Sequence, residues 1–481
     1  MLLVLGVAII AAAIYAVLRK VDVRLALLCA GLLLGAISGQ AAAVVQKFFS
    51  GMTNGEYVIP LCSAMGFAHV LRLTECDQHL VRLLVRPLRR VRSLLIPGAV
   101  AVGFLVNIPV VSQTSTAVSI GSVLIPLLLA ARVTPETAGA ALLLGASIGG
   151  ELLNQGAPEF RTIIQGTSAL GYPAPSGARL VGIMLPFNLL HLGIATLVFW
   201  GLSRKFERAA VGAEREEPVP ASAGVELPIS LIKAAVPLLP LALLFLVAEP
   251  FRVLEIPREW LVGPKEAVSI LQDASETLKQ PTFARAAQEA FSSRLIGAAM
   301  IVGVVVAALT DFRKIGKVAG SFFEGAGYAY ANIVSLIVVA TCFGEGIKQI
   351  GLDQAIHGVV RGAPGLLVPS SVLVSMGFAF VSGSGIAATQ SLFRFFGEPA
   401  GHIGVAPEFV GVLVSLGAAA GRTMSPVAAV ALMSGSLTGT SAAVLVKRVS
   451  LPLLAGMAAV ILAGLIAVST GRFEVTAPAS P

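Results

Sequence analysis

An arginine beside a broken apolar helix is the residue in this sequence best suited to binding chemistry. Residues 414–426 read Val-Ser-Leu-Gly-Ala-Ala-Ala-Gly-Arg-Thr-Met-Ser-Pro, with apolar sequence on both sides. Pro426 blocks the helix just after Arg422, so we expect the chain to unwind here. A guanidinium in apolar surroundings needs a partner, and its planar fork suits a carboxylate. We therefore expect Arg422 to bind an anionic substrate; the alternative is a structural cap on the broken backbone's carbonyls.

A second broken helix precedes the first by 272 residues. Residues 144–158 read Leu-Gly-Ala-Ser-Ile-Gly-Gly-Glu-Leu-Leu-Asn-Gln-Gly-Ala-Pro, and the opening Leu-Gly-Ala recurs at 416–418. Interrupted helices at corresponding places in two halves indicate a transporter's substrate site. Glu151 and Glu159 flank the first break, where either could bind a coupling ion or simply lie at a polar helix end. The site residues predicted at the two breaks are Asn154, Gln155, Gly156, Pro158, Arg422, Thr423, Ser425 and Pro426.

Two polar tips, each between apolar runs, complete the candidate site. Runs 94–111 and 117–131 flank the first tip, and runs 366–381 and 389–402 flank the second. The predicted site residues here are Ser112, Gln113, Thr114, Ser115, Thr116, Ser382, Gly383, Ser384, Gly385 and Thr389. Helix ends at such tips offer amide groups to a carboxylate or carbonyls to sodium, although small residues also permit close helix packing. A sodium ion would bind near Ser115, Asn154, Ser384 and Thr423.

The composition places these residues in a membrane. The 481-residue chain is 56% hydrophobic and 12% charged, with a mean hydropathy of +0.88, which is too apolar for a water-soluble protein. About ten spans are predicted, near 1–18, 25–39, 56–74, 137–164, 178–202, 229–249, 294–310, 325–345, 406–436 and 449–469. The two tips with their flanking runs are predicted to form re-entrant hairpins, because irregular backbone is tolerated at depth only where it lines a cavity.

Positive charge predicts the orientation. Lys and Arg gather in the segments 19–24, 72–93, 204–228, 311–317 and 447–448, which we assign to the cytoplasm. This bias accounts for the net charge of +8 without a nucleic-acid partner. Both termini are then periplasmic, and the two halves begin on opposite faces, as inverted repeats do.

The predicted domains follow the repeat. Residues 1–203 form the first repeat, 204–228 a cytoplasmic linker, 229–470 the second repeat and 471–481 a tail. A polar external insert is expected at 251–293, and an interfacial helix at 82–92. The pair Asp77-Gln78 recurs as Asp353-Gln354 and is a second trace of the repeat.

No motif in the sequence indicates an enzyme. There is no Walker sequence, no nucleophile–base pair, and neither the four cysteines nor the five histidines have metal-ligand spacing. We predict that the chain is not an enzyme and holds no cofactor beyond sodium or protons as a coupling ion.

Three segments resemble the DcuC (C4-dicarboxylate uptake C) family of the ion-transporter superfamily. They are 380–386 (Phe-Val-Ser-Gly-Ser-Gly-Ile), 416–427 (Leu-Gly-Ala-Ala-Ala-Gly-Arg-Thr-Met-Ser-Pro-Val) and 446–452 (Val-Lys-Arg-Val-Ser-Leu-Pro). The resemblance implies secondary transport of C4-dicarboxylates such as succinate and fumarate. The superfamily implies a homodimer, two inverted repeats and a mobile transport domain that carries two hairpins against a scaffold. The first break departs from the family pattern, because 154–159 (Asn-Gln-Gly-Ala-Pro-Glu) lacks hydroxyl residues.

The sequence therefore predicts an all-α polytopic carrier of the inner membrane that moves a C4-dicarboxylate by alternating access, in an elevator-like motion. Coupling to sodium, protons or counter-substrate stays open, so the carrier is either a symporter or an antiporter. Transport of another organic anion on the same fold is the nearer alternative, and an anion channel is the more distant one.

Overall fold

The computed structural model describes residues 2–19, 21–87, 94–210, 229–247, 253–262, 281–351 and 364–475. These residues are almost all helical, and their only extended pairing is an isolated bridge between Val405 and Glu474. The predicted all-α class is confirmed. The first half comprises α1 (Leu2–Leu18), α2 (Val23–Ile37), α3 (Ala41–Met52), α4 (Gly55–Thr74), α5 (Cys76–Val85), α6 (Leu95–Asn107), α7 (Gln113–Ala130), α8 (Pro135–Ser147), η3 (Gly150–Leu153), α9 (Pro158–Ala169) and α10 (Gly177–Ala210).

The second half adds shorter helices before its long ones. Its elements are α11 (Leu231–Ala235), η4 (Val236–Leu238), α12 (Leu239–Val247), α13 (Arg258–Leu261), α15 (Pro281–Leu309), η5 (Phe312–Lys314), α16 (Ile315–Ala329), the π-helix η6 (Tyr330–Val334), α17 (Ser335–Gln349), η7 (Pro364–Leu366), α19 (Leu367–Ser382), α20 (Gly385–His402), α21 (Pro407–Thr423), α22 (Ala429–Thr438) and α23 (Ala442–Ser469). The end of the predicted external insert is helical and continuous with the following span, since α15 runs from Pro281 to Leu309 without a break.

Several helices are long and apolar enough to cross a membrane, as expected of a multi-pass membrane protein. Among the described residues these are Gln113–Ala130, Gly177–Arg208, Phe312–Gln349, Pro364–Ser382 and Ala442–Ser469. The described ranges also contain seven shorter apolar helices of 10–17 residues. Two of the five long segments, α7 and η7–α19, are the ones that the sequence assigned to hairpin arms.

Three pairs of helices have matching positions in the two halves. Helices α6, α7 and α8 start at 95, 113 and 135, and α19, α20 and α21 start 272 residues later, at 367, 385 and 407. Local chemistry explains the match. Pro135 and Pro407 both occupy the first turn, where a proline costs no hydrogen bond. Ser112 and Ser384, also 272 apart, each cap the following helix by accepting an N–H from three residues ahead.

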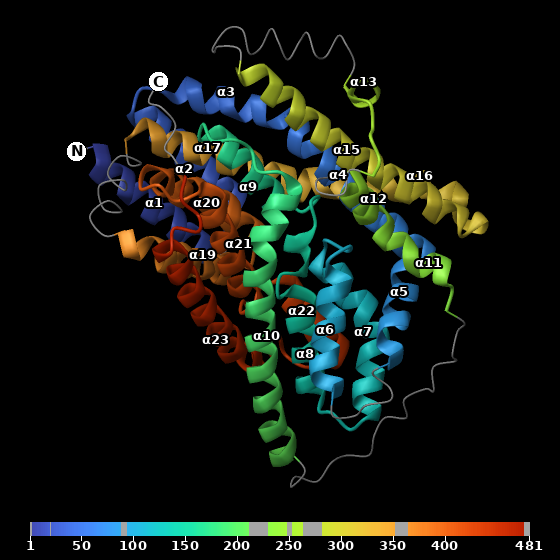
Figure 1. The fold of residues 1–481 in the computed structure, drawn as a ribbon. Helices are drawn as coiled ribbons and strands as arrows, with labels where there is room; N and C mark the ends of the chain where they lie inside the picture. The colour runs from blue at the N-terminus through green and yellow to red at the C-terminus, as the bar shows by residue number, and fades with distance from the viewer. Residues whose placement is uncertain are drawn as a thin grey trace.

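Buried apolar side chains group the helices into two bodies, which meet where Ala387 of α20 joins the cluster of α1, α2 and α17. The largest cluster of buried side chains joins α6–α10 with α19–α23, and smaller clusters join α1, α2, α4, α12, α15 and α17. In Figure 1 helices α6, α7, α8 and α22 lie together, while α3, α15 and α16 cross the other end of the molecule. In the second body, formed by the helices of the smaller clusters, α16 lies directly on α4. The approach is so close that a Cβ at Gly325 would come within 2.4 Å of the carbonyl oxygen of Met65.

Some predictions fall on residues outside the described ranges. These are the second-half trace Asp353-Gln354, the basic residues Arg89, Arg90 and Arg92 of the interfacial helix, most of the 204–228 linker, and the middle of the 251–293 insert. The start of the predicted linker is helical, because α10 runs to Ala210.

Candidate functional site

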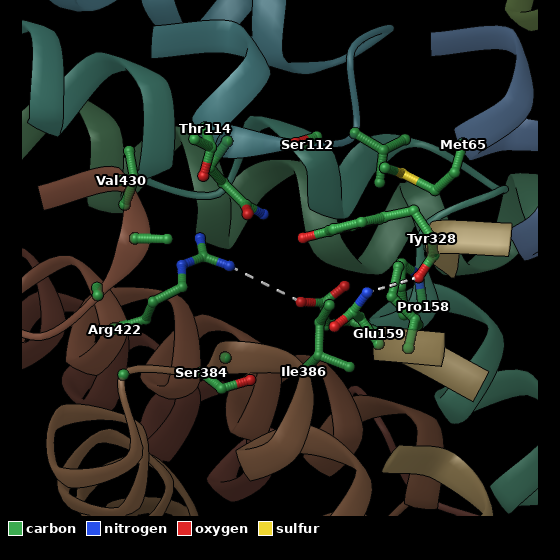
Figure 2. A pocket seen from close by; sticks show the side chains of 18 residues that line it. Met65, Ser112, Thr114, Pro158, Glu159, Tyr328, Ser384, Ile386, Arg422 and Val430 are labelled. Carbon is green, nitrogen blue, oxygen red and sulfur yellow. Dashed lines mark hydrogen bonds and ion pairs between the residues drawn. The ribbon is translucent and has the colours of Figure 1, made fainter. Parts of the chain in front are cut away.

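A cavity of about 210 Å³ lies where the two helical bodies meet (Figure 2). A single water needs only about 10–15 Å³ of such space, so the cavity is large enough for a small organic molecule. Its lining residues are Met65, Val111, Ser112, Gln113, Thr114, Pro158, Glu159, Tyr328, Asn332, Ile333, Gly383, Ser384, Gly385, Ile386, Arg422, Ala428, Ala429 and Val430. Both predicted polar tips are among them, so the structure brings the tips together.

Four helices begin at this cavity. The first turns of α7, α9, α20 and α22 contribute Gln113, Pro158, Gly385 and Ala429 to its wall. Helices α7 and α20 carry serine caps, whereas α9 and α22 have no side-chain cap. Each helix N-terminus carries a partial charge of about +0.5, so these four helix ends favour an anion beside them.

The second tip is a sharp reversal. Helix α19 ends at Ser382 and α20 begins at Gly385, with Gly383 in the left-handed region at φ 69°. A side chain at Gly383 would be strained at this φ, which explains the glycine. The Ser382 hydroxyl accepts the Ser384 N–H at 3.3 Å and holds the turn.

Arg422 reaches across from the second half to the first. Its side chain is buried, and its Nη2 donates to the Ser147 carbonyl at 2.9 Å and to Glu151 Oε1 at 2.6 Å. Its Nη1 lies 3.9 Å from Glu159 Oε1 (Figure 2). A Cβ at Gly385 would come within 3.0 Å of Nη1, so only a glycine leaves this side of the guanidinium open. Arg422 thus caps a helix end with one nitrogen and faces the cavity with the other.

The two predicted acidic residues both meet the guanidinium. Glu151 also accepts from Gln113 Nε2 at 2.9 Å, whereas neither oxygen of the buried Glu159 has a hydrogen-bond partner among the residues that the structure describes. Among the described residues, Arg422 is the only basic side chain that lines the cavity, so two carboxylates share one cation. Buried carboxylates without full compensation are costly, so this cluster favours the uptake of a proton or another cation.

Irregular backbone positions Glu151. It lies in the short helix η3, which follows Gly149 at φ 115°. Asn188 donates to the Gly149 carbonyl at 2.6 Å, and the Asn107 side chain accepts the Glu151 N–H at 3.2 Å. These amides satisfy backbone groups that the broken helix leaves unpaired.

Several other predicted residues brace the breaks and do not line the cavity. Thr423 donates to the Ser147 carbonyl at 2.8 Å, and Asn154 donates to the Ile108 carbonyl at 2.8 Å. Thr116 donates to a carbonyl in the turn before α7 at 3.1 Å. The predicted residues outside the cavity lining are Ser115, Thr116, Glu151, Asn154, Gln155, Gly156, Ser382, Thr389, Thr423, Ser425 and Pro426.

The polar corner between α4 and α5 holds the first tip from outside. Arg72 donates to the Ser115 hydroxyl, and the Ser119 hydroxyl donates to Asp77, one helical turn further along α7. At the same corner Lys314 bonds Glu75 Oε1 at 2.8 Å, and this hydrogen bond lowers the pKa of the Glu75 carboxyl below its usual value. The tip is therefore fixed in place by neighbouring helices as well as by its own cap.

The four predicted sodium ligands have separate hydrogen-bond partners. Ser115 bonds Ser112, Ser384 caps α20, and Asn154 and Thr423 bond carbonyls of different segments. No cluster of three or more His, Cys, Asp or Glu side chains with metal-binding geometry occurs within the described ranges. The sodium site stays a prediction.

Sequence reasoning missed one wall of the cavity. Met65 of α4 and Tyr328, Asn332 and Ile333 of the α16–η6 region line the side contributed by the second body. A π-helix at Tyr330–Val334 is the local irregularity here, and π-helical turns often occur at functional sites. Tyr328, Tyr330 and Asn332, polar groups within an apolar run, were the available signal.

Comparison with known proteins gives a consistent result. The sequence pattern of the DcuC family, described as C4-dicarboxylate anaerobic carrier, matches residues 1–469. A putative uncharacterized transporter of Haemophilus influenzae is 38% identical over 130 residues, which cover 27% of this chain and 90% of that protein. The anaerobic C4-dicarboxylate transporter DcuC of Escherichia coli K12 is 27% identical over 173 residues, 34% of this chain and 38% of that carrier.

A solved structure has a similar fold. The crystal structure of the Alcanivorax borkumensis YdaH transporter, which has an unusual topology, aligns with a TM-score of 0.55 at 17% identity. The alignment covers 93% of this chain and 97% of that one, so the likeness extends over the whole fold.

Proposed function

The chain belongs to the DcuC family of C4-dicarboxylate anaerobic carriers, and we propose that it moves a C4-dicarboxylate such as succinate or fumarate across the inner membrane. It is a multi-pass membrane carrier and not an enzyme. The substrate, the coupling ion and the transport cycle are the parts that we propose.

One observation carries the proposal: four helix N-termini and Arg422 surround a single cavity. At about +0.5 per N-terminus, the four helices together supply a partial charge of roughly +2, which is equal and opposite to the charge of a dicarboxylate. Free amide groups in the first turns of α9 and α22 can donate to carboxylate oxygens, since no side chain caps them.

Arg422 would bind one substrate carboxylate through Nη1. Its other terminal nitrogen stays on Ser147 and Glu151, so the side chain is held in place before the substrate arrives. This geometry is compatible with both roles that the sequence suggested for Arg422, which are binding of a substrate carboxylate and capping of backbone carbonyls.

Charge balance makes Glu159 the better candidate for ion coupling. A dianion entering beside an ionised Glu159 would be repelled, because Glu151 already neutralises the guanidinium at 2.6 Å. A proton or sodium ion on Glu159 removes this repulsion, so substrate and cation would enter together. Glu151 is the second candidate, but its contacts with Arg422 and Gln113 favour a structural role.

The transport cycle that we propose is alternating access by an elevator-like movement. The 272-residue offset of three helix pairs supports two inverted repeats, residues 1–203 and 229–470 with the linker 204–228 between them. The body of α6–α10 and α19–α23 would be the mobile domain, with hairpins α6–α7 and α19–α20, and the other body the scaffold. We further propose about ten spans, a homodimer and periplasmic termini.

Counterflow in proteoliposomes tests the function. Liposomes loaded with unlabelled succinate receive labelled succinate outside, and a carrier produces a transient accumulation of label. Liposomes loaded with butyrate, a monocarboxylate of the same length, are the control. No counterflow with succinate, fumarate or malate would refute the C4-dicarboxylate proposal. Counterflow with a different organic anion would support the same fold and site with another substrate.

A further inference from the structure

The cavity has two unlike walls. One wall carries the helix N-termini, Arg422 and Glu159, all from the body of α6–α10 and α19–α23. The opposite wall, from α4, α16 and η6, has no charged side chain among its described lining residues and offers two polar groups, Tyr328 and Asn332. In Figure 2 the Tyr328 ring extends into the cavity, with its hydroxyl towards the side where Arg422 lies.

Local structure holds Tyr328 and Asn332 in this position. The Asn332 amide donates to the Tyr328 carbonyl at 3.0 Å, across the start of the π-helix. The Tyr328 ring lies beside His69 of α4, with ring centroids 6.4 Å apart. Gly325 lets α16 lie directly on α4, so the ring is carried by a close helix–helix contact. The Tyr328 side chain is half exposed, and within the described part of the chain its hydroxyl has no hydrogen-bond partner.

A dicarboxylate presents a charged group at each end, but the described lining of the cavity has one guanidinium, that of Arg422. If Arg422 binds the first carboxylate, the second must be held by neutral donors. A phenol hydroxyl and an amide N–H are suitable donors, and hydrogen bonds to ionised groups are the strong ones. Neutral donors that lie opposite the wall of Arg422 and the helix N-termini therefore suit a ligand with two separated carboxylates.

We propose that Tyr328, with Asn332 beside it, binds the second carboxylate of the substrate and so selects dicarboxylates over monocarboxylates. This inference rests on the proposed transport of a C4-dicarboxylate. It assigns a specificity role to the wall of α4 and α16, across which the mobile body would slide.

The test compares Tyr328→Phe with Tyr330→Phe in the competition of unlabelled acids against labelled succinate exchange. Tyr330 is a matched control, because its hydroxyl donates to the Met52 carbonyl at 3.0 Å and it does not line the cavity. We expect Tyr328→Phe to weaken inhibition by succinate about tenfold to a hundredfold. Inhibition by butyrate should be unchanged, because butyrate has no second carboxylate. Tyr330→Phe should change neither.

A second variant probes the same wall independently. Asn332→Asp places a negative charge near the second carboxylate, so we expect it to weaken inhibition by succinate more than inhibition by butyrate. Equal losses for both acids in Tyr328→Phe, or no loss for either, would overturn the inference while the proposed function survives. A wild-type protein that exchanges no dicarboxylate would overturn both. Size-exclusion profiles of the purified variants identify any loss that comes from misfolding.

Discussion

Replacement of Arg422 by lysine separates the two roles of this side chain. The arginine uses Nη2 for the Ser147 carbonyl and Glu151, and it presents Nη1 towards the cavity. A lysine ammonium is a single point and cannot occupy both positions at once. Because Glu151 is fully buried beside it, we expect the ammonium to stay with that carboxylate. The cavity then loses its charged donor, but the buried ion pair remains.

The magnitude follows from the interaction that is lost. A hydrogen bond to an ionised group contributes about 1.5–3 kcal/mol, which corresponds to roughly a 10- to 150-fold loss of succinate affinity. Stability should change little, since charge is retained. Alanine is a poorer probe, because breaking a buried ion pair costs about 3–5 kcal/mol and the protein could unfold.

The assay measures the half-saturating succinate concentration for exchange in proteoliposomes, together with the melting temperature of the purified protein. Arg394→Lys is a matched control on α20. Arg394 pairs with Glu398 at 3.8 Å, is 35% exposed and does not line the cavity. This control should leave both quantities unchanged.

An unchanged half-saturating succinate concentration in Arg422→Lys would refute the proposal that Arg422 binds a substrate carboxylate. Arg422 would then be a cap that joins the two broken helices. A large fall in melting temperature with unchanged affinity would lead to the same conclusion.

Three further outcomes are expected. Wild-type affinity for succinate should fall as pH rises, because deprotonation adds a negative charge at Glu159. The Glu159→Gln variant should bind succinate with an affinity that does not depend on pH. A variant that keeps the wild-type pH profile in tracer-uptake measurements would contradict this. Gly385→Ala introduces a Cβ 3.0 Å from the Arg422 guanidinium, and this overpacking, which costs about 1–3 kcal/mol, should weaken succinate binding. In the control Gly182→Ala the new Cβ enters open space, so succinate binding should not change. Ser384→Ala and Ser441→Ala each remove a helix cap and should lower stability by about 1 kcal/mol, but only the first should reduce succinate affinity.

Much of the helical framework could be predicted from local signals. Apolar composition required a membrane protein, and the Leu-Gly-Ala repeat predicted an offset of 272 that the helix starts reproduce. The break at Pro426 was also correct, since α21 ends at Thr423 and α22 begins at Ala429. Predictions were less accurate where an apolar run met a polar insert, because α15 continues through both.

The candidate site could be predicted only in part. The polar tips and Arg422 were identifiable because glycine, serine and arginine are unusual in apolar sequence. The same criterion also selected Thr116, Asn154 and Thr423, which bond broken backbone and do not line the cavity. Residue type reveals that a polar group needs a partner, but it does not reveal which partner the fold provides.

The sequence by itself therefore determined that the protein lies in a membrane, and also its class of fold, its family and the places where helices break. These properties depend on composition and on neighbours along the chain, such as a proline in a first turn or a serine cap. Only the tertiary structure decided that Arg422 meets Glu151 from 271 residues away, that four helices begin at one cavity, and that Tyr328 faces them. These contacts depend on which helices from distant parts of the chain pack against each other, and no local sequence pattern specifies that pairing.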